Sequence, residues 1–409
     1  MRNNGIIPFI IKCIVILIGS VILGSILVIG AYAIPNNLVE QNIEHSLEIL
    51  KKESPDGGWT EVFTHGWAGN LDAGTDEKIF SDANVDPENG LLRSAFGTYA
   101  RMWNGYMVLV RPLLMLFSYG QIRFIFYIAI AFMTWYICIM LKDRLGIGVS
   151  FAYVASLLMV NIILVPYNIV ISVFILAMSA INIWVLKKYR GDVPLYELGT
   201  VFFVSGITDI FFDMFTAPLV VLCMPLLILL FIDIRNENLN IKQNVIKIIF
   251  CSVMWFSGYV LFWGLKWILS TVFTGENIVS DALNTIFFRA GGQTGQKSGP
   301  LYSIFKNVAA IIPTDGKNIG GVIFLFIISG LLLVMFFAKN KPKKIDVKKY
   351  TPCYIVMLFP FVWYAVVSNH SIIHATIYSY RLMMIPIFGF LSVLFIETRK
   401  PKENRNEEK

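Results

Sequence analysis

The sequence predicts an all-α polytopic membrane protein, a bundle of about ten transmembrane helices with a long first loop on the outer side. Three observations lead to this class: 56% of the 409 residues are hydrophobic, only 15% are charged, and the mean hydropathy is +0.67. A soluble domain carries roughly a quarter charged residues. The composition therefore excludes a water-soluble globular protein, a disordered chain and a disulfide scaffold.

Ten apolar stretches are long enough to be candidates for crossing a bilayer, which takes about 20 residues. The first is too long for the core of a signal peptide, so we interpret it as a retained span, although Ala31-Tyr32-Ala33 is a weak cleavage signal. The predicted spans cover residues 7–34, 122–141, 147–165, 168–186, 195–212, 215–233, 247–270, 319–338, 351–368 and 377–396.

Orientation follows from the positions of lysine and arginine. Most of them fall in segments that are cytoplasmic when the N-terminus is cytoplasmic, including the run of lysines from Lys339 to Lys349. Positive charge in short cytoplasmic loops sets the topology of membrane proteins. We therefore expect one multi-pass domain over residues 1–396 with both termini in the cytoplasm, and a disordered charged tail over 397–409. The net charge of +7 then reflects topology, and no nucleic-acid partner is expected.

Two outer loops are longer than a connection requires, residues 35–121 and residues 271–318. Long loops on a rigid scaffold often carry function. The first contains Asp72-Ala73-Gly74-Thr75-Asp76-Glu77, in which three carboxylates lie close together. Such a group can supply a general base or bind a divalent cation. The alternative interpretation is a solvated acidic turn.

Further polar and aromatic residues gather in the outer half. Asp209 and Asp213 are four residues apart, so both lie on one helix face, where they form a site or cap a hairpin in water. Lys266 near the outer end of its span is a candidate cation or a side chain that extends to the interface. The first long loop adds candidates for substrate binding or for structural and interfacial roles: Arg101, Trp103, Tyr106 and Arg111.

The most specific pattern opens the last span. If this segment is helical, His370, His374 and Arg381 lie on one stripe. In zinc proteases a glutamate accompanies two histidines at this spacing, and here there is none. Imidazole and guanidinium groups can both donate hydrogen bonds to phosphate oxygens. The stripe therefore suits phosphate better than metal. All four histidines, these two with His45 and His65, fall on the predicted outer side.

Arg289 lies in an amphipathic stretch of the second long loop and is a further candidate cation for the site. The alternative interpretation is that Arg289 faces lipid headgroups at the membrane interface. An acid that activates a hydroxyl opposite cations that stabilise a phosphate leaving group is an arrangement for transfer from a lipid phosphate. The predicted outer rim holds both kinds of group.

An ordered series of motifs resembles uncharacterised polytopic bacterial proteins of the GT-C glycosyltransferase type. The first motif is the acidic outer loop. The chain departs from the pattern at Asn104, where close relatives are expected to carry histidine. The other motifs are Tyr99-x-Arg101-x-Trp103-x-Gly105-Tyr106 before Arg111-Pro112, Phe212-Asp213-Met214-Phe215-Thr216-x-Pro218, and Asn369-His370-x-x-x-His374 with Tyr378-x-Tyr380-Arg381.

The resemblance implies a GT-C-like fold and transfer of a hexosyl or pentosyl group from a polyprenyl-phosphate-linked donor. The acceptor would be a cell-surface glycan or lipid on the outer face of the bacterial cytoplasmic membrane. The matching catalytic carboxylates are Asp76, which we prefer, and Asp72. Some members need a divalent cation, which makes Mg²⁺ or Mn²⁺ the candidate cofactor. The implied contacts to the donor phosphate come from Arg289, His370, His374, Arg381 and Lys266.

Two other functions compete with the glycosyltransferase. A transporter or flippase of lipid-linked glycans would need charged groups along a path that opens to both faces. A glycan polymerase or O-acyltransferase also works on sugars at the outer face. A cavity that brings the acids and the cations together at one end of the bundle is the arrangement expected for the transferase.

Overall fold

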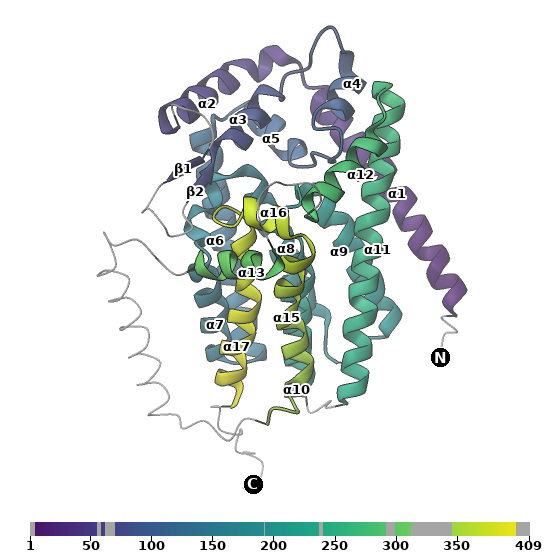
Figure 1. The fold of residues 1–409 in the computed structure, drawn as a ribbon, viewed down its shortest axis with the longest axis vertical. Helices are drawn as coiled ribbons and strands as arrows, with labels where there is room; N and C mark the ends of the chain where they lie inside the picture. Colours follow the sequence, from purple (N-terminus) through teal and green to yellow (C-terminus); the bar gives the residue numbers. More distant parts are fainter. Residues whose placement is uncertain are drawn as a thin grey trace, which may run out of the picture.

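The structure is a computed structural model, and it describes residues 5–54, 59–61, 70–191, 193–236, 240–291, 299–311 and 346–397. Within these ranges the chain is helical apart from one short antiparallel hairpin (Figure 1). Six helices are long and apolar enough to cross a membrane: α1 (Ile6–Tyr32), α6 (Tyr119–Arg144), α8 (Ile169–Lys188), α9 (Leu195–Phe212), α11 (Ile241–Thr274) and the segment Ser379–Glu397, which comprises η3 (Ser379–Met383) and α17 (Met384–Glu397). The chain is thus a helical membrane protein.

Three of the ten predicted spans correspond to shorter helices. They are α7 (Ile147–Met159), which is followed by η2 (Ile162–Tyr167), α10 (Leu219–Arg235) and α15 (Thr351–Val366). A further predicted span, residues 319–338, lies outside the described residues. The structure therefore supports six spans by length and composition, and the count of ten remains a prediction.

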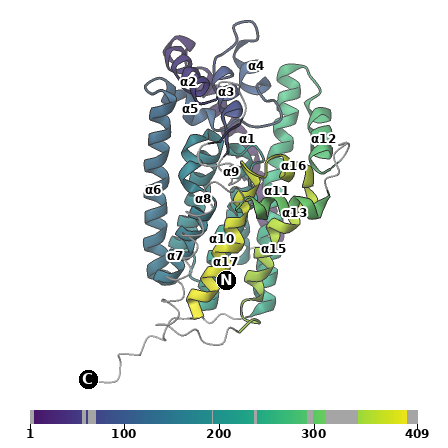
Figure 2. The same ribbon diagram turned by 60° about the vertical axis from the view of Figure 1, so that its left-hand side comes forward.

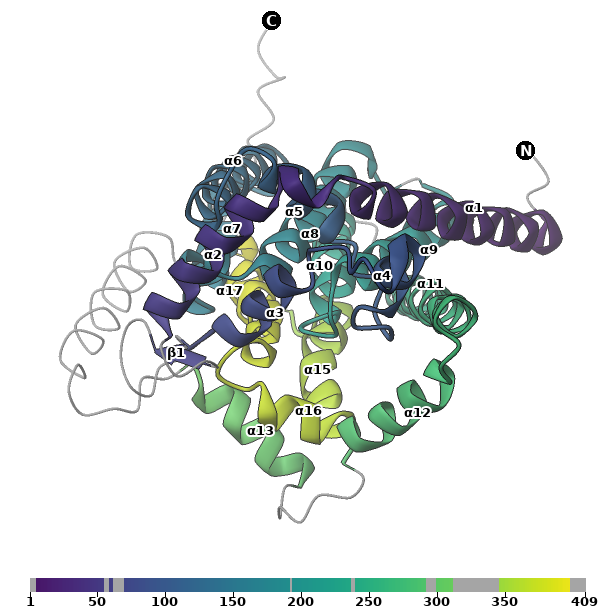
Figure 3. The ribbon, with the colours of Figure 1, turned by 90° about the horizontal axis from the view of Figure 1, so that it is seen from above.

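Helix α10 lies inside the bundle, because all its residues from Leu219 to Ile234 are buried (Figure 3). Other helices present apolar side chains outward. On α1, Ile7 and Ile26 are more than half exposed, and Phe132 on α6 is exposed to a similar degree. In a membrane protein such faces contact lipid, whereas a helix with apolar residues all round is either buried or a span. The outer helices thus shield α10 from lipid.

Helices α9 and α11 pack at backbone contact through two glycines. A Cβ atom on Gly206 would lie 2.0 Å from the carbonyl oxygen of Trp255, and one on Gly258 would lie 2.1 Å from that of Phe203. Small residues allow this approach, which is how many helices associate within membranes. The tight pairing fixes α11 against the bundle and with it the segments that follow at the outer end.

Gly206→Ala should therefore lower stability, because the added methyl group forces α9 and α11 apart. Overpacking of this kind costs about 1–3 kcal/mol. Gly264→Ala is the matched control on α11, since nothing lies within 4 Å of a Cβ atom built there. Thermal unfolding of the purified protein in one detergent measures the difference. Equal midpoints for the two variants would contradict the close contact.

The long first loop folds into a cap over one end of the bundle (Figure 1). In strands β1 (Trp59–Glu61) and β2 (Asn70–Asp72), Trp59 pairs with Asp72. Arg123 at the start of α6 forms a bidentate ion pair with Glu53, at 2.6 and 2.8 Å, which ties the cap to the bundle. The helical elements of the cap are η1 (Asn36–Leu38), α2 (Glu40–Glu53), α3 (Ala73–Ser81), α4 (Gly90–Gly97) and α5 (Met107–Leu114).

Three short helices lie below the cap beside the bundle, with α13 the farthest from the cap: α12 (Ile278–Arg289), α13 (Pro300–Ala309) and α16 (Ser368–Ile373) (Figure 2). The chain leaves the opposite end of the bundle at both termini (Figure 1). Helices α6 and α8 end on that side of the bundle, and their last turns carry the basic residues Lys142, Arg144, Lys187 and Lys188. The cap and the two ends of the described chain therefore lie on opposite sides of the bundle, and the assignment of the termini to the cytoplasm remains a prediction.

Candidate functional site

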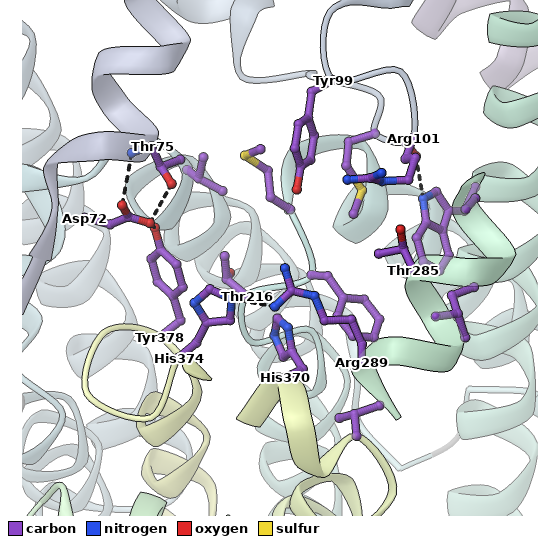
Figure 4. Close-up of a pocket in the computed structure, with 18 residues that line it drawn as sticks. Asp72, Thr75, Tyr99, Arg101, Thr216, Thr285, Arg289, His370, His374 and Tyr378 are labelled. Atoms are coloured by element: carbon purple, nitrogen blue, oxygen red, sulfur yellow. Dashed lines mark hydrogen bonds between the residues drawn. The ribbon is translucent and has the colours of Figure 1, made fainter. Parts of the chain in front are cut away.

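A cavity lies between the cap and the end of the bundle that the cap covers (Figure 4). Its empty space is about 810 Å³, including the part that opens to solvent. The polar residues of its wall come from segments far apart in the sequence. Asp72 and Thr75 lie at the start of α3, Tyr99 and Arg101 in the loop after α4, and Thr216 in the loop before α10. Thr285 and Arg289 lie in α12, His370 in α16, and His374 and Tyr378 in the turn after α16.

Asp72 is the carboxylate of this wall, and its position is fixed by hydrogen bonds. It is the N-cap of α3, where its Oδ1 accepts from the backbone N–H of Thr75 at 3.0 Å. Its Oδ2 accepts from the Thr75 hydroxyl at 2.5 Å and from the Tyr378 hydroxyl. An Asp at this position commonly caps the first turn of a helix. The carboxylate is therefore held in one orientation beside the cavity.

Arg289, at the end of α12, is a half-buried cation without an acidic partner. Among the described residues no carboxylate lies within ion-pair distance, and its Nη1 contacts Nε2 of His374 at 2.9 Å. Burial and the charge of Arg101 lower the pKa of Arg289, although an arginine stays charged. Buried charges are normally paired. The cavity therefore offers a positive charge that lacks its anion.

The two histidines of the wall are neutral at physiological pH. Burial, and in the same direction the charge of Arg289, together lower the pKa of His374 to about 4, although Asp72 opposes the shift. Burial also lowers the pKa of His370, and His374 and Arg289 add to this effect. Because a guanidinium only donates, Nε2 of His374 must accept and the ring proton sits on Nδ1. His374 is thus a neutral donor at Nδ1.

His370 has spare hydrogen-bonding capacity. The ring is buried against Phe215, with the ring centroids 5.0 Å apart, and it lies 4.7 Å from the His374 ring. Its nitrogens find no partner of good geometry among the described side chains, although the ring approaches the backbone of Phe215. Nδ1 of His374 is also unpartnered within the described ranges. Such groups are available to a ligand.

The depressed pKa of His374 predicts a loss of stability in acid. Below pH 6.5 the unfolded chain takes up a proton that the folded protein refuses until about pH 4, so stability falls as pH falls through this window. The loss is at most about 3 kcal/mol, because one pKa unit is worth about 1.4 kcal/mol. His374→Gln should flatten this dependence in thermal unfolding, whereas His45→Gln, at an exposed position on α2, should leave it unchanged.

Two bulky residues of the wall hold a left-handed backbone. Tyr99 has φ of 42° and Phe215 has φ of 67°, values that side chains other than glycine and asparagine seldom adopt. Such strain persists only where the surroundings impose it, and it is common at functional sites. Both residues line the cavity, so the strained positions of the chain and its candidate site coincide.

Of the residues predicted from the sequence, five line this cavity: Asp72, Arg101, Arg289, His370 and His374. Arg101 is paired with Asp281 on α12 at 2.6 Å, so its charge is partly compensated. The structure thus brings one predicted acid, two predicted arginines and two predicted histidines to one place.

Asp76, the preferred catalytic carboxylate, lies elsewhere. It is fully buried, accepts from the Tyr119 hydroxyl, and accepts from the backbone N–H of Ile169 at 3.2 Å and from the Asn168 side chain at 3.4 Å. Burial raises its pKa well above the usual value of an aspartate, which favours the neutral acid. These contacts join α3 to the bundle, and we therefore favour Asp72 as the candidate base.

Two of the predicted phosphate ligands are bonded within the protein. Nζ of Lys266 donates to the carbonyl oxygen of Phe96 at 2.9 Å and to the Ser270 hydroxyl at 2.8 Å. Arg381 donates to the carbonyl oxygens of Val160 and Asn161 at 2.5 and 3.2 Å. Neither residue lines the cavity. Both are positioned to hold chain segments together at the outer end.

The aromatic segment of the first loop is likewise packed inside the protein. Trp103 stacks on Phe262 and donates to its carbonyl oxygen at 2.9 Å. The Tyr106 hydroxyl donates to Asn104 at 3.1 Å. Arg111 is buried and donates to the carbonyl oxygens of Ala83 and Ile34. These residues fix the loop that carries Tyr99 and Arg101.

The two aspartates near the end of α9 are buried as well. Asp209 accepts from the Trp255 indole at 3.1 Å, and its other oxygen has no partner in the described part of the chain. Asp213 caps the following turn, because it accepts from the backbone N–H and the hydroxyl of Thr216. Thr216 itself lines the cavity, so Asp213 supports the wall from behind.

Several wall residues were missed by the sequence analysis. Thr75 has a local signal, since a helix-capping aspartate regularly accepts from the backbone N–H of the residue three positions later. Tyr378 stands in the quoted terminal motif, but its contact with Asp72 joins residues that are 306 positions apart. The left-handed Tyr99 and Phe215 carry no signal, because neither is a residue type that favours this conformation.

In the described residues no three His, Cys, Asp or Glu side chains converge as a metal site would require. Asp72 is the carboxylate that a divalent cation in the cavity would meet. Comparisons with known protein families, with curated proteins and with solved structures gave no match. The functional argument therefore rests on the site itself.

Proposed function

We propose that this chain is a GT-C type glycosyltransferase that transfers a sugar from a polyprenyl-phosphate-linked donor to a cell-surface glycan or lipid. The observation that carries the proposal is the pairing, within one cavity, of a carboxylate and a cation that lacks an acidic partner. A ligand with a hydroxyl at one end and a phosphate at the other complements these walls.

In this mechanism Asp72 accepts the proton of the acceptor hydroxyl. The hydroxyl oxygen attacks the anomeric carbon while the bond from that carbon to the phosphate oxygen breaks, and polyprenyl phosphate leaves with the bonding electrons. Arg289 and the Nδ1 proton of His374 stabilise the charge on the leaving group. Tyr378 and Thr75 position the carboxylate.

An apolar groove between α8 and α9 supports a lipid-linked donor. Its empty space is about 1010 Å³, and its wall includes Val173 on α8 and Phe212 at the end of α9. Val170, one helical turn before Val173, lines the cavity, and so does Met214, just after Phe212. The groove therefore begins beside the cavity and runs along the membrane-spanning part of the bundle. A polyprenyl chain fits such a groove.

A second, polar depression supports a hydroxylated acceptor. Its wall includes Asp82, Asn84 and Asn89. Tyr99 belongs to both walls, and α3 runs from one to the other, since Asp72 lies at its start and Lys78 farther along. Amides and carboxylates of this kind hydrogen-bond sugar hydroxyls. The acceptor would thus approach from the cap side, and the donor from the membrane side.

The transporter alternative would require a charged path through the bundle. The residues that such a path would hold are His370, Asp213 and Lys266. His370 lines the cavity, whereas Asp213 and Lys266 are bonded to protein groups in the described structure and do not line it. The arrangement at one end of the bundle favours the transferase.

The proposal is tested with the purified protein in vesicles that contain radiolabelled undecaprenyl-phosphate hexoses and pentoses, one sugar at a time. We expect release of the label from one donor into water or onto added membrane glycans. Failure of every donor in protein that is folded, as judged by its thermal transition, would contradict the proposal. Movement of intact donor between leaflets without cleavage would support the flippase instead.

A further inference from the structure

Helices α12 and α13 carry exposed apolar faces beside the cavity. On α12, Phe287 is 63% exposed and Leu283 55%, whereas Ile278 and Ala282 are buried against the protein. Apolar residues at positions 283 and 287 are four apart, so they lie on one face of the helix. The face with Leu283 and Phe287 is therefore directed away from the rest of the protein, whereas the face with Ile278 and Ala282 packs against it.

Helix α13 has the same construction. Leu301 is 82% and Phe305 68% exposed, and they too are four residues apart. The opposite face is polar and buried, because Asn307 donates to the carbonyl oxygen of Ser371 at 2.9 Å, and the neighbouring Lys306 donates to that of Ile372 at 3.1 Å. Both contacts attach α13 to α16. Helix α13 is therefore amphipathic: its polar face is attached to α16, and its apolar face is exposed.

These two faces continue a surface that already faces lipid. Val272 near the end of α11 and Val366 at the end of α15 are well exposed, and α12 and α13 follow on the same side of the bundle around α16 (Figure 3). Large apolar side chains in such a continuous band are not left in water. Amphipathic helices of this length bury their apolar face at the boundary between headgroups and acyl chains.

We propose that α12 and α13 are seated in the membrane leaflet on the cap side, with Leu283, Phe287, Leu301 and Phe305 in lipid. Arg289 ends α12, so the cavity that it lines lies at the depth of the lipid phosphates. A phosphate-bearing lipid then reaches Arg289 from the side, within the plane of the membrane. The identity of that lipid as the sugar donor rests on the proposed function, whereas the seating of the helices does not.

The seating is tested by nitroxide spin labels on Phe287→Cys and Phe305→Cys in the full chain, reconstituted into phosphatidylcholine and phosphatidylglycerol vesicles. Oxygen concentrates in lipid and a nickel chelate in water, so their effects on spin relaxation report depth. We expect both labels to be more accessible to oxygen than to nickel. Glu77→Cys, exposed on α3, is the aqueous control, and unsubstituted protein gives the background of the native cysteines. Nickel accessibility at 287 and 305 equal to that at 77 would overturn the proposal.

A label on Thr285→Cys, in the wall of the cavity, separates this inference from the proposed function. Immobilisation when undecaprenyl phosphate is added to the vesicles, but not when phosphatidylglycerol is added, supports lateral access by the donor lipid. Equal immobilisation by both lipids supports lateral access and contradicts selection of a polyprenyl donor. No change with either lipid overturns lateral access.

Discussion

Asp72→Asn should lower the rate of sugar transfer by about 10²- to 10⁴-fold, the usual contribution of a general base. The substitution keeps the fold, because asparagine also caps helices: its oxygen can still accept from the backbone N–H of Thr75, and its amide can donate to the hydroxyl oxygen of Tyr378. It removes only the ability to take the acceptor proton. The measurement is transfer from the active donor in vesicles, with kcat and KM determined separately, and the loss should fall on kcat.

Two other aspartates provide matched controls for Asp72→Asn. Asp143→Asn makes the same chemical change at an exposed position in the last turn of α6 and should leave transfer unchanged. Asp76→Asn resembles the neutral acid that burial already favours, so the folded protein should retain transfer. Full activity of Asp72→Asn together with a large loss in Asp76→Asn would reverse the assignment of the base.

Arg289→Gln should lower kcat/KM by about 10²- to 10³-fold, as expected when a group that stabilises developing charge is removed. The half-buried guanidinium has no acidic partner in the described structure, so its removal leaves no orphaned carboxylate and should not unfold the protein. Arg289→Lys keeps the positive charge but loses the planar guanidinium group, so its kcat/KM should lie between that of Arg289→Gln and that of the unsubstituted protein. Transfer and donor KM are measured in the same vesicles.

Arg93→Gln is the control for Arg289→Gln. Arg93 is exposed, pairs with Glu276 at 3.2 Å and lies in the wall of the polar depression but outside the cavity, so its loss should leave the donor KM near that of the unsubstituted protein. Similar losses in both variants would indicate a general effect of cap charge on activity. That outcome would contradict a specific contact between Arg289 and the donor phosphate.

Hydropathy predicted the long helices well because a bilayer imposes its own length on them. It did not separate Asp72 from Asp76, since what distinguishes them comes from distant segments. Tyr119 and Asn168 enclose Asp76 from 43 and 92 residues away, and no local pattern reveals such contacts. The sequence thus identified the acidic loop, and only the packing showed which of these two carboxylates lines the cavity.

The stripe of His370, His374 and Arg381 illustrates a second limit. It depended on one continuous helix, but α16 ends at Ile373, and the chain then turns before η3 begins at Ser379. Arg381 is thereby directed to the carbonyl oxygens of Val160 and Asn161 instead of the cavity. The two histidines are close enough in sequence to stay together through the turn. Spacing arguments hold over one or two helical turns and fail across an unforeseen break.

The position of a bound phosphate tests the central claim most directly. A structure of the protein in nanodiscs with undecaprenyl phosphate should show the phosphate within hydrogen-bonding distance of Arg289 and of Nδ1 of His374, in the cavity that Asp72 lines, with the chain running toward the groove between α8 and α9. A phosphate bound at Lys266 or Arg381, or outside this cavity, would contradict the account.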